Sequence, residues 1–565
     1  MRIFMTRAVG IGKQDFEKII VSHNFYVDKT LFLKEWWENN DDVTLISRPR
    51  RFGKTLTISM TERFFSVKYA SQGEIFSGLN IWKEEKYQKL QGTFPVISIS
   101  FANVKETTYE KCKIRICQII SDLYIKNNFL KDSGVLADKD KEYFDRVSEQ
   151  MSETDATISL HKLCDFIQRY YGRRVILLLD EYDTPMQEAY INGYWSEIVA
   201  FIRNLFNSTF KTNPFLERAI MTGITRVSKE SIFSDLNNLE VVTTTSKKYE
   251  DSFGFTQAEV SAALLEFGLS DQEENVKNWY DGFTFGDRTD IYNPWSILNF
   301  LDKKKLSTYW ANTSSNNLVG KLIQEGSRDI KITMENLLNG EILHTRIDEQ
   351  IVFNQLTHNE YAIWSLLLAS GYLKVEQHTV NPDTGREEYD LKLTNKEVKL
   401  MFLNIIESWF KRYSPAYNDF IKALLLHDKK AMNHYMNKVS LATFSCFDTG
   451  NKPSETAEPE RFYHGFVLGL IVELSDQYII TSNRESGFGR YDIMLKPKNH
   501  ADDAFILEFK VHDKEDEKTL QDTVDAALLQ IREKQYAASL KAEGIPENHI
   551  FAYGFAFEGK KVLIG

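Results

Sequence analysis

Short apolar runs, separated by segments with helical periodicity, divide the first half of the chain. The longer runs are apolar on both faces, which is typical of central strands in a parallel sheet whose connections are helices. The predicted strands are Val43–Ser47, Phe94–Phe101, Val175–Leu179, Leu216–Gly223 and Leu239–Thr245. The predicted helices are Thr107–Asn128, His161–Tyr171 and Trp195–Phe210. We therefore predict an α/β domain over residues 1–255, in which the polar residues 131–156 form a surface insertion.

A mainly helical pattern replaces the strands after residue 255. Thr256-Gln-Ala-Glu259 has the spacing of a capping box, in which the side chains of the first and fourth residues cap backbone N–H groups at a helix start. We predict a helical lid over residues 256–350. Its aromatic segments, Trp279–Gly286 and Ile291–Ser296, are expected to form its core.

Helical patterns continue over residues 351–454 and include one predicted hairpin. The turn sequence Asn381-Pro-Asp-Thr-Gly385 separates two strand-like runs, Tyr372–Glu376 and Glu388–Leu393. This combination predicts a mainly helical connector, for which a winged-helix-like module is one possible form. The predicted helices are Tyr361–Gly371 and Val398–Tyr413.

A second α/β pattern occupies residues 455–565. The polar segment Gly450–Pro459 contains two prolines and predicts a linker before it. The predicted helices are Arg461–Leu474 and Leu520–Tyr536, and the predicted strands are Tyr478–Thr481, Tyr491–Leu495 and Phe505–Val511.

Composition and charge limit the class of protein. The chain has 565 residues, 42% hydrophobic and 26% charged, as in soluble proteins of several domains. Its four cysteines lack a C-x-x-C spacing, so we expect reduced thiols and no zinc site. No apolar run reaches about 18 residues and no signal-peptide pattern is present, so we expect a cytoplasmic protein without a membrane segment. The net charge of −11 argues against broad coating of nucleic acid but allows a local basic groove.

The first candidate for chemistry is the loop after the first predicted strand, Arg48-Pro-Arg-Arg-Phe-Gly-Lys-Thr55. A strand, a tight loop and a helix start form the layout of a phosphate-binding loop, whose backbone N–H groups face the phosphates of a nucleotide. Lys54 would reach the phosphates, and the Thr55 hydroxyl would ligate Mg²⁺. Arg48 replaces the first glycine of the standard G-x-x-x-x-G-K-[ST] pattern, and an ordinary basic loop is the alternative.

Two carboxylates, Asp180 and Glu181, follow the third predicted strand, at the edge where open α/β sheets bind ligands. Asp180 would hold Mg²⁺, directly or through water, and Glu181 would polarise the attacking water. At the end of the next strand and directly after it, Thr222 and Thr225 are candidates for sensing the γ-phosphate, and Arg226 for contacting it. The alternatives are acidic residues of an ordinary loop and an arginine in a surface ion pair. Together with the preceding loop, the carboxylates indicate an ATPase.

The last domain carries a second constellation, Asp492 and Glu508-x-Lys510. Glu508 and Lys510 are two residues apart on a predicted strand, so their side chains share one face. If Asp492 lies on the neighbouring strand of a hairpin, two carboxylates meet beside a lysine. Such a site can bind Mg²⁺ or Mn²⁺ for activation of water, while Lys510 orients the nucleophile or offsets charge. A solvated strand face with an ion pair is the alternative.

These motifs, in this order, resemble a family of bacterial and archaeal proteins that join an AAA-ATPase-like domain to a C-terminal PD-(D/E)xK nuclease-like domain. The resemblance covers nearly the whole chain. Before residue 300 it is carried by Tyr26–Thr30, Arg48–Thr55, Leu179–Asp183, Thr222–Arg226, Trp279–Gly282 and Tyr292–Ser296. At the C-terminus it is carried by Phe462–Gly465, Ser482–Gly487, Gly489–Asp492 and Glu508–Lys510.

The resemblance implies a fold and two sets of site residues. The fold is α/β: a P-loop NTPase (AAA-like) parallel sheet with a helical lid, a helical connector and a restriction-endonuclease-like domain. The ATP site would comprise Pro49, Arg50, Arg51, Phe52, Gly53, Lys54, Thr55, Thr222 and Arg226, with Thr55 and Asp180 on Mg²⁺ and Glu181 as the catalytic residue. The nuclease site would comprise Asp492, Glu508, Lys510 and Gln530, with Asp492 and Glu508 on Mg²⁺ or Mn²⁺, and a further acid from Glu460, Glu473 or Glu485.

Three functions are compatible with these motifs. In the first, ATP binding or hydrolysis regulates metal-dependent phosphodiester cleavage of nucleic acid, with DNA as the first candidate. In the second, the protein is a non-catalytic ATP switch whose last domain only binds nucleic acid or a protein. Residues 455–565 carry 13 Lys/Arg against 20 Asp/Glu, which favours the second, whereas the trio around Glu508 favours the first, which we prefer. The third is a homo-oligomeric ring that remodels its target, for which Arg226 would act across subunits.

Overall fold

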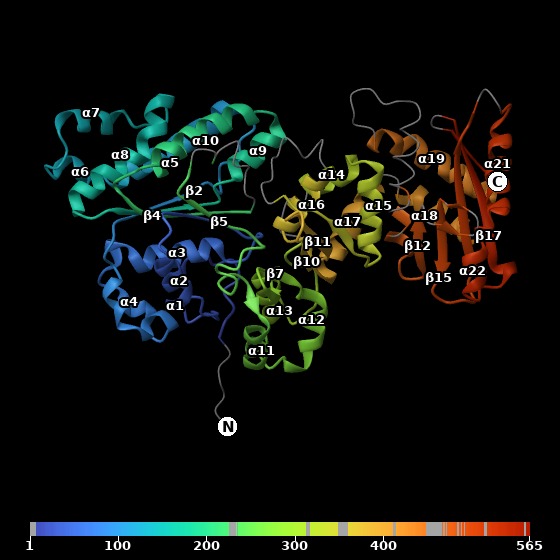
Figure 1. The fold of residues 1–565 in the computed structure, drawn as a ribbon, viewed down its shortest axis with the longest axis horizontal. Coiled ribbons are helices and arrows are strands. Elements are labelled where there is room, and N and C mark those ends of the chain that lie inside the picture. The colour runs from blue at the N-terminus through green and yellow to red at the C-terminus, as the bar shows by residue number, and fades with distance from the viewer. Residues whose placement is uncertain are drawn as a thin grey trace. The chain divides into compact units, whose positions relative to one another are not determined.

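The computed structural model describes residues 7–224, 233, 236–311, 317–348, 360–410, 414–447, 466, 469–470, 472–482, 485–486, 489–490, 492–513, 517–558 and 561–565. The chain forms two compact units (Figure 1). The first unit consists of residues 1–314 and 344–398, and the second of residues 315–343 and 399–565.

A five-stranded parallel sheet forms the centre of the first unit, in the order β2-β3-β4-β1-β5. The strands are β1 (Val43–Ser47), β2 (Val96–Ser100), β3 (Val175–Asp180), β4 (Leu216–Gly223) and β5 (Leu239–Val242). Every residue of β1 and β3 is buried, including the polar Thr44, Ser47 and Asp180, as expected for central strands of a parallel sheet. Because β4 lies between β3 and β1, the carboxyl ends of these three strands meet at one edge. The parallel α/β sheet predicted from the sequence is confirmed.

Helices cover both faces of this sheet, with α5, α8 and α10 on one face and α2 and α3 on the other (Figure 1). Their buried positions recur every three or four residues, so each helix turns one apolar stripe toward the core. The helices around this sheet include α1 (Phe16–Val21), α2 (Leu31–Asn39), α3 (Lys54–Phe65), α4 (Glu85–Leu90), α5 (Tyr109–Lys126), α8 (Glu153–Tyr171), α9 (Thr184–Asn192) and α10 (Trp195–Phe210).

Residues 131–156 are more than the expected surface insertion. They contain the last two residues of α6 (Phe129–Asp132) and all of α7 (Asp138–Arg146). Phe144 of α7 is buried and packs its ring against Tyr124 and Phe166. The many charges of this segment conceal a short apolar stripe in the sequence pattern, so the expectation holds only for its exposed residues.

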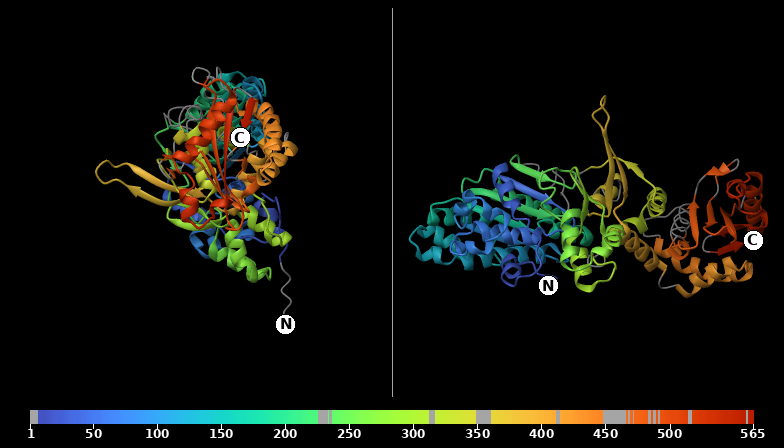
Figure 2. Two further views of the ribbon diagram at one scale, coloured as in Figure 1. Left: turned by 90° about the vertical axis from the view of Figure 1, so that its right-hand side faces the viewer. Right: turned by 90° about the horizontal axis from the view of Figure 1, so that it is seen from below.

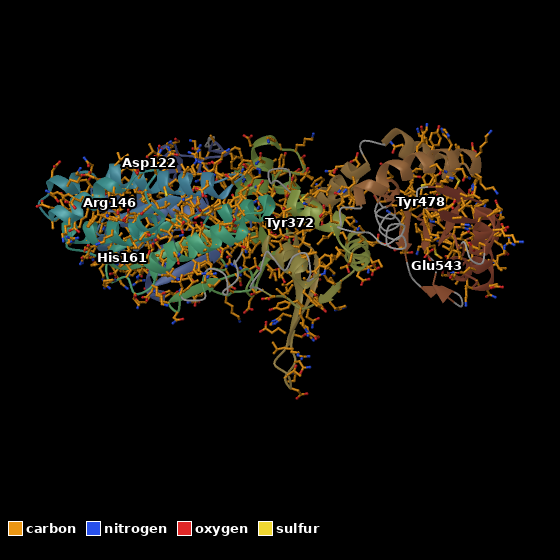
Figure 3. All side chains as sticks on the ribbon, turned by 90° about the horizontal axis from the view of Figure 1, so that it is seen from above. Asp122, Arg146, His161, Tyr372, Tyr478 and Glu543 are labelled. Carbon is orange, nitrogen blue, oxygen red and sulfur yellow. The ribbon has the colours of Figure 1, made fainter. Side chains whose placement is uncertain are left out.

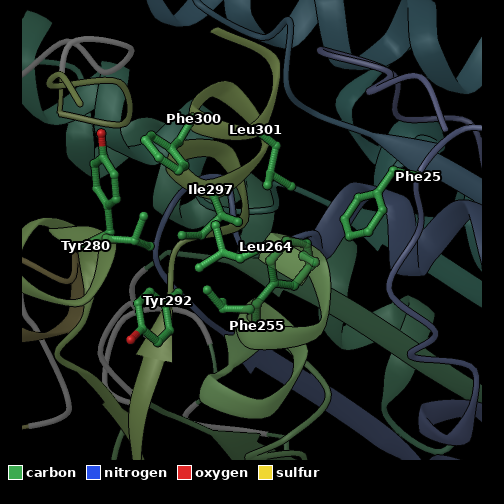
Figure 4. Close-up of a cluster of buried hydrophobic side chains, with 11 residues drawn as sticks. Phe25, Phe255, Leu264, Tyr280, Tyr292, Ile297, Phe300 and Leu301 are labelled. Atoms are coloured by element: carbon green, nitrogen blue, oxygen red, sulfur yellow. The ribbon is translucent and has the colours of Figure 1, made fainter. Parts of the chain in front are cut away.

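The predicted lid combines helices with a small sheet. The helices are α11 (Gln257–Glu266), α12 (Glu273–Tyr280) and α13 (Pro294–Lys303). The strands β6 (Phe255–Thr256), β8 (Arg288–Tyr292) and β7 (Phe283–Phe285) form an antiparallel sheet in that order, which the sequence analysis missed because the strands are so short. The capping box at Thr256 and Glu259 is present. Aromatic residues, among them Tyr280, Tyr292 and Phe300, form the lid core as predicted (Figure 4).

The predicted hairpin is confirmed and longer than expected. It consists of β10 (Leu373–Val380) and β11 (Glu387–Leu393), with β9 (Leu343–Thr345) beside β11. The hairpin projects from the rest of its unit (Figure 2), and Tyr372 marks its base (Figure 3). The preceding helix, α16 (Glu360–Ala369), buries most of its side chains, and α17 (Lys396–Phe410) follows the hairpin.

A mixed five-stranded sheet forms the centre of the second unit, in the order β12-β15-β16-β17-β18. Only β16 and β17 pair in parallel. The strands are β12 (Tyr478–Ser482), β15 (Ile493–Pro497), β16 (Ala504–Val511), β17 (Ile550–Glu558) and β18 (Lys561–Ile564), with a separate hairpin of β13 (Glu485–Ser486) and β14 (Gly489–Arg490). The sequence analysis did not predict β17 and β18.

The two faces of β16 pack against different elements, because its side chains alternate. Ile506 packs with Ile531 of α21 on one face, while Phe509 stacks on Phe555, which packs with Phe420 of α18, on the other. Glu508 and Lys510 therefore share the α21 face with Ile506. The helices of this unit are α14 (Asn317–Glu325), α15 (Arg328–Leu338), α18 (Ser414–Leu425), α19 (Lys429–Phe447), α21 (Leu520–Glu533) and α22 (Ala538–Ala542).

The packing of the hairpin base against the lid generates a stability prediction at Gly282. This glycine has φ +121°, and a Cβ atom would lie 2.1 Å from the carbonyl oxygen of Thr394. We expect Gly282→Ala to destabilise the first unit by more than about 2 kcal/mol, because both the dihedral and the contact are unfavourable. Calorimetric melting of the full chain measures this as a lowered transition.

Gly172 supplies a matched control. It ends α8 at φ +65°, and no atom lies within 4 Å of the position that a Cβ atom would take. Gly172→Ala therefore carries only the backbone cost of about 1 kcal/mol. Equal melting temperatures for the two variants would show that the contact with Thr394 costs nothing.

Candidate functional site

The loop of residues 48–55 lies between β1 and α3, at the carboxyl edge of the sheet. Gly53 precedes α3 with φ +87°, a left-handed conformation that glycine adopts without steric cost. The Nζ atom of Lys54 donates to the carbonyl oxygens of Arg48 and Pro49, each at 2.8 Å. The loop therefore curls around the ammonium group of Lys54.

The ammonium group of Lys54 is in an environment that disfavours its charge. Lys54 is buried, and burial lowers its pKa to about 8, while the charges of Glu181, Asp180 and Asp183 act in the opposite direction. A cation with few water molecules around it attracts an anion more strongly than an exposed lysine does. The carbonyl groups that hold Lys54 would give way to a phosphate without further desolvation of the lysine.

Asp180 joins three elements at the same edge. Its Oδ2 atom accepts a hydrogen bond from Thr55 Oγ1 of α3 at 2.8 Å, and its Oδ1 atom accepts one from Thr222 Oγ1 of β4. The strand order β3-β4-β1 brings these residues together although they are far apart in the sequence. A hydroxyl and a carboxylate beside a lysine are the oxygen donors that suit Mg²⁺ on a phosphate.

Glu181 occupies a constrained backbone position directly after β3. Its φ is +52°, and its backbone N–H donates to Thr222 Oγ1 at 3.3 Å. Its carboxylate accepts a hydrogen bond from Thr184 Oγ1 at 3.3 Å. Non-glycine residues in this conformation require support from their surroundings, and such positions cluster at functional sites. Thr225 and Arg226, the other candidates on this edge, lie outside the described residues.

Two side chains that the sequence analysis did not assign extend this edge. Asp183 is buried and accepts hydrogen bonds from the Ile224 N–H at 3.0 Å and from Gln187 Nε2 at 2.9 Å. Gln187 Oε1 in turn accepts from Arg50 Nη2 at 3.3 Å. The spacing of Asp183 and Gln187, one helical turn apart, is the only sequence signal for this connection.

Arg48, which replaces the standard glycine, has a structural role in the first unit. Its side chain is fully buried, and its guanidinium group donates to the carbonyl oxygens of Thr243 and of Lys248, the latter at 3.2 Å. The group also lies over the ring of Phe285, 4.4 Å from its centre. The arginine thus fastens the segment after β5 to the start of the loop, and its backbone still contributes a carbonyl group to Lys54.

The second cluster of candidate residues lies on the α21 face of the mixed sheet. Asp492 directly precedes β15, and Ile493 is paired with Leu507, so Asp492 lies opposite Glu508. The Asp492 N–H donates to Glu508 Oε2 at 3.4 Å, and the Phe509 N–H donates to Asp492 Oδ2 at 2.7 Å. The hairpin arrangement that the sequence analysis required is present.

Gln530 of α21 connects the other two residues of this cluster. Its Nε2 atom donates to Glu508 Oε1 and to the hydroxyl oxygen of Tyr536, and its Oε1 atom accepts a hydrogen bond from Lys510 Nζ at 2.8 Å. One amide thereby fixes the carboxylate and the ammonium group next to each other. Tyr536, whose side chain is buried, is a partner that the sequence analysis did not identify.

Glu508 is in an environment that disfavours its charge. Only 3% of its surface is exposed, and burial together with the nearby Asp492 raises its pKa to about 8, although Lys510 and Gln530 act against this. When two carboxylates lie in contact, the charge of each disfavours ionisation of the other, and a bound cation would offset this free-energy cost. The cluster is therefore suited to bind a cation.

His512 continues the same face of β16 and was also missed. Its Nδ1 atom lies 2.9 Å from Thr523 Oγ1 of α21 and 3.3 Å from Glu517 Oε2. The alternating pattern Glu508-x-Lys510-x-His512 is a signal that could have indicated it, because alternate residues of a strand share a face.

The three candidates for the further acid of this site are Glu460, Glu473 and Glu485. Glu473 is exposed, Glu460 lies outside the described residues, and the side chain of Glu485 is not described. A fourth acid, Glu335 of α15, is buried and accepts hydrogen bonds from the N–H and hydroxyl groups of Ser482 at the end of β12. Within the described ranges, no group of three or more His, Cys, Asp and Glu is arranged to hold a metal ion.

Comparison with known proteins agrees with this geometry. Residues 10–233 match the family model of a predicted AAA-ATPase, and residues 458–565 match that of the PD-(D/E)XK nuclease superfamily. This chain joins an AAA-ATPase-like domain to a PD-(D/E)XK nuclease-like domain. An uncharacterized protein in the vnfD 5′ region of Azotobacter chroococcum mcd 1 is 25% identical over 566 residues, covering 98% of this chain and 97% of the relative.

The two matched domains contain the two clusters. The 48–55 loop, Asp180, Glu181 and Thr222 lie in the AAA-ATPase-like domain, and Asp492, Glu508, Lys510 and Gln530 lie in the nuclease-like domain. The lid and the connector fall outside both matches. Of the helices that are described, none has the length and apolar character needed to cross a membrane.

The role of Arg48 in the AAA-ATPase-like domain can be tested by restoring the standard pattern. We expect Arg48→Gly to destabilise the first unit by on the order of 3 kcal/mol, because two charge-assisted hydrogen bonds and a stacked ring are lost. Arg51→Ala is the control, since Arg51 is exposed and lies over Trp295. Thermal melting distinguishes them, and a gain in stability for Arg48→Gly would contradict this role.

The protonation of Glu508 in the nuclease-like domain gives a pH dependence. The folded-state pKa, about 8, lies above the ordinary value of 4.5, so the unfolded chain ionises first as the pH rises. In EDTA, stability should fall between pH 4.5 and about 8 for the wild type, whereas Glu508→Gln lacks this component. Melting curves of the second unit across this range test it. If the difference in stability between the wild type and Glu508→Gln is the same at every pH, the raised pKa of Glu508 is contradicted.

Proposed function

We propose that this protein is an ATPase in which nucleotide binding or hydrolysis regulates metal-dependent phosphodiester cleavage of nucleic acid by the nuclease-like domain. The observation that carries the proposal is the hydrogen-bonded set of Asp492, Glu508, Lys510 and Gln530, in a chain that also curls a loop around the buried Lys54. Such arrangements cost stability, and binding of a charged ligand would offset that cost.

In the proposed ATP site, the backbone N–H groups of residues 50–55 would surround the phosphates. Lys54 would exchange the carbonyl groups of Arg48 and Pro49 for phosphate oxygens. Thr55 and Asp180 would hold Mg²⁺, which fits their hydroxyl and carboxylate oxygens at 2.8 Å from each other. Glu181 would take a proton from the attacking water, and Thr222, which bonds both Asp180 and the Glu181 N–H, would orient them. Arg226 is the proposed arginine contact to the γ-phosphate.

In the proposed nuclease site, Asp492 and Glu508 would hold Mg²⁺ or Mn²⁺. The fit rests on their two facing carboxylates, which are oxygen donors whose mutual repulsion a cation would relieve. A metal ion bound there supplies Lewis-acid activation of water and of the phosphate. Lys510 would stabilise the negative charge that develops on the phosphate, and Gln530 would hold Lys510 and Glu508 in register.

The proposed substrate is nucleic acid, with DNA first, and we propose the domain limits 1–255, 256–350, 351–454 and 455–565. A homo-oligomer is compatible with this function. The second candidate is a non-catalytic ATP switch that only binds its partner. The acidic balance of residues 455–565, 20 Asp/Glu against 13 Lys/Arg, favours this alternative, because it weakens attraction to a polyanion.

Cleavage of supercoiled plasmid with Mg²⁺ or Mn²⁺, with and without ATP, separates the two candidates. We expect nicking by the wild type that responds to ATP, loss of nicking in Asp492→Asn, and unchanged ATP hydrolysis in that variant. In Glu181→Gln we expect ATP binding to persist while hydrolysis falls by roughly 100-fold or more. The regulation by ATP should then change without any change at the nuclease site.

Asp525→Asn is the matched control for charge removal, because Asp525 is exposed on α21 and bonds only Gln521 among the contacts described. Equal nicking by wild type and Asp492→Asn would assign the cleavage to another protein. Bound ATP with no nicking of DNA or RNA by any variant would favour the non-catalytic switch.

A further inference from the structure

The peptide group between Arg50 and Arg51 is held from outside the 48–55 loop. The carbonyl oxygen of Arg50 accepts hydrogen bonds from Trp310 Nε1 at 3.0 Å and from Asn293 Nδ2 at 3.3 Å. A trans peptide is planar, so its C=O and N–H groups point in opposite directions. The two donors therefore direct the Arg51 N–H away from Trp310 and Asn293.

This peptide group needs external support because Arg51 has an unfavourable backbone conformation. Its φ is +66°, in the left-handed region, which costs a non-glycine residue about 1–3 kcal/mol. The hydrogen bonds from Trp310 and Asn293 to the Arg50 carbonyl group stabilise this conformation from outside the loop.

Trp310 is itself fixed in place by aromatic packing. Its side chain is buried, and its ring lies 5.5 Å from the rings of both Phe283 and Tyr372. Phe283 also packs against Phe52 of the loop at 4.8 Å. The indole N–H can only donate, so a carbonyl oxygen is the partner that its burial requires.

One buried carboxylate organises the backbone on which Trp310 lies. Glu397, 1% exposed, accepts hydrogen bonds from the Trp310 N–H at 2.7 Å and the Ala311 N–H at 3.4 Å, and also from the Tyr309 N–H. Its other oxygen accepts from Ser296 Oγ at 2.7 Å, in the first turn of α13. Because Asn293 caps that same turn, Glu397 supports both donors to the Arg50 carbonyl group.

Glu397 lies in the first turn of α17. Residues up to Val398 belong to the first unit, and the remainder of α17 belongs to the second. The contacts of Glu397 are thus made by the start of a helix whose later turns are part of the other unit.

We propose that Trp310 is a positioning residue of the ATP site, and that Glu397 links the geometry of the 48–55 loop to the first turn of α17. The inference rests on the proposed ATP binding. Nucleotide binding needs the Arg51 N–H on the inner side of the loop, so it favours the arrangement in which Trp310 and Glu397 make these hydrogen bonds. Any movement of the start of α17 that breaks them lowers nucleotide affinity, and by linkage bound nucleotide opposes that movement.

Trp310→Phe in the full chain tests the positioning role, because phenylalanine keeps an aromatic ring at this position and lacks the indole donor, at the cost of some buried ring volume. Titration with a fluorescent ATP analogue in the presence of Mg²⁺ should show an affinity about tenfold weaker than that of the wild type. Trp279→Phe is the matched control, since Trp279 lies in the lid against Tyr280 and Lys396. Its affinity should equal that of the wild type.

Glu397→Gln tests the link to α17. The amide keeps one acceptor oxygen, whereas both oxygens of the carboxylate accept hydrogen bonds. We therefore expect a loss of affinity of about threefold, smaller than that of Trp310→Phe. Circular dichroism checks that the variant is folded. A purely structural role would lower the melting temperatures of both variants and leave their affinities unchanged, which would overturn the inference. If the wild type itself does not bind the analogue, the proposed ATP site fails instead.

Discussion

The contact between Asp180 and two hydroxyl groups, those of Thr55 and Thr222, is the interaction on which the carboxyl edge of the parallel sheet depends. One carboxylate at the end of β3 holds the first turn of α3 on one side and the end of β4 on the other. This carboxylate therefore fixes the position of the loop of residues 48–55 relative to the segment that begins at Thr222. The strand order makes this possible, because β4 lies directly between the strands that carry Asp180 and the loop.

In the nuclease-like domain, the amide group of Gln530 connects the site residues. At the carboxyl edge of the parallel sheet, the carboxylate of Asp180 has this role. Gln530 donates to Glu508 and accepts from Lys510, so one helix residue sets the distance between an acid and a base on the strand below it. Both sites therefore place buried charged groups side by side and connect them through a neutral or shared partner. In both sites, burial favours the neutral form of one side chain. It lowers the pKa of Lys54 and raises the pKa of Glu508. A ligand of opposite charge would reverse that shift.

Arg48 and Trp310 show how this molecule stabilises the loop of residues 48–55. The side chain of Arg48 binds the segment after β5. An arginine in place of the standard glycine therefore does not fill the space inside the loop. Trp310 and Asn293 hold the peptide group between Arg50 and Arg51. Residues outside the matched AAA-ATPase-like segment thus contribute to the geometry inside it.

Local patterns in the sequence were sufficient for the parallel sheet, the capping box at Thr256, the hairpin and the face shared by Glu508 and Lys510. Each depends on periodicity or spacing over a few residues, which the backbone converts directly into burial or direction. The meeting of Asp492 with Glu508 was conditional on a strand pairing, and the structure supplies that pairing. Tertiary structure alone decided the partners that are distant in the chain: Gln187 with Arg50, Glu335 with Ser482, and Trp310 with both Arg50 and Glu397. No periodicity encodes such pairs, because they arise only when separate elements pack and a buried polar group must find the nearest donor or acceptor.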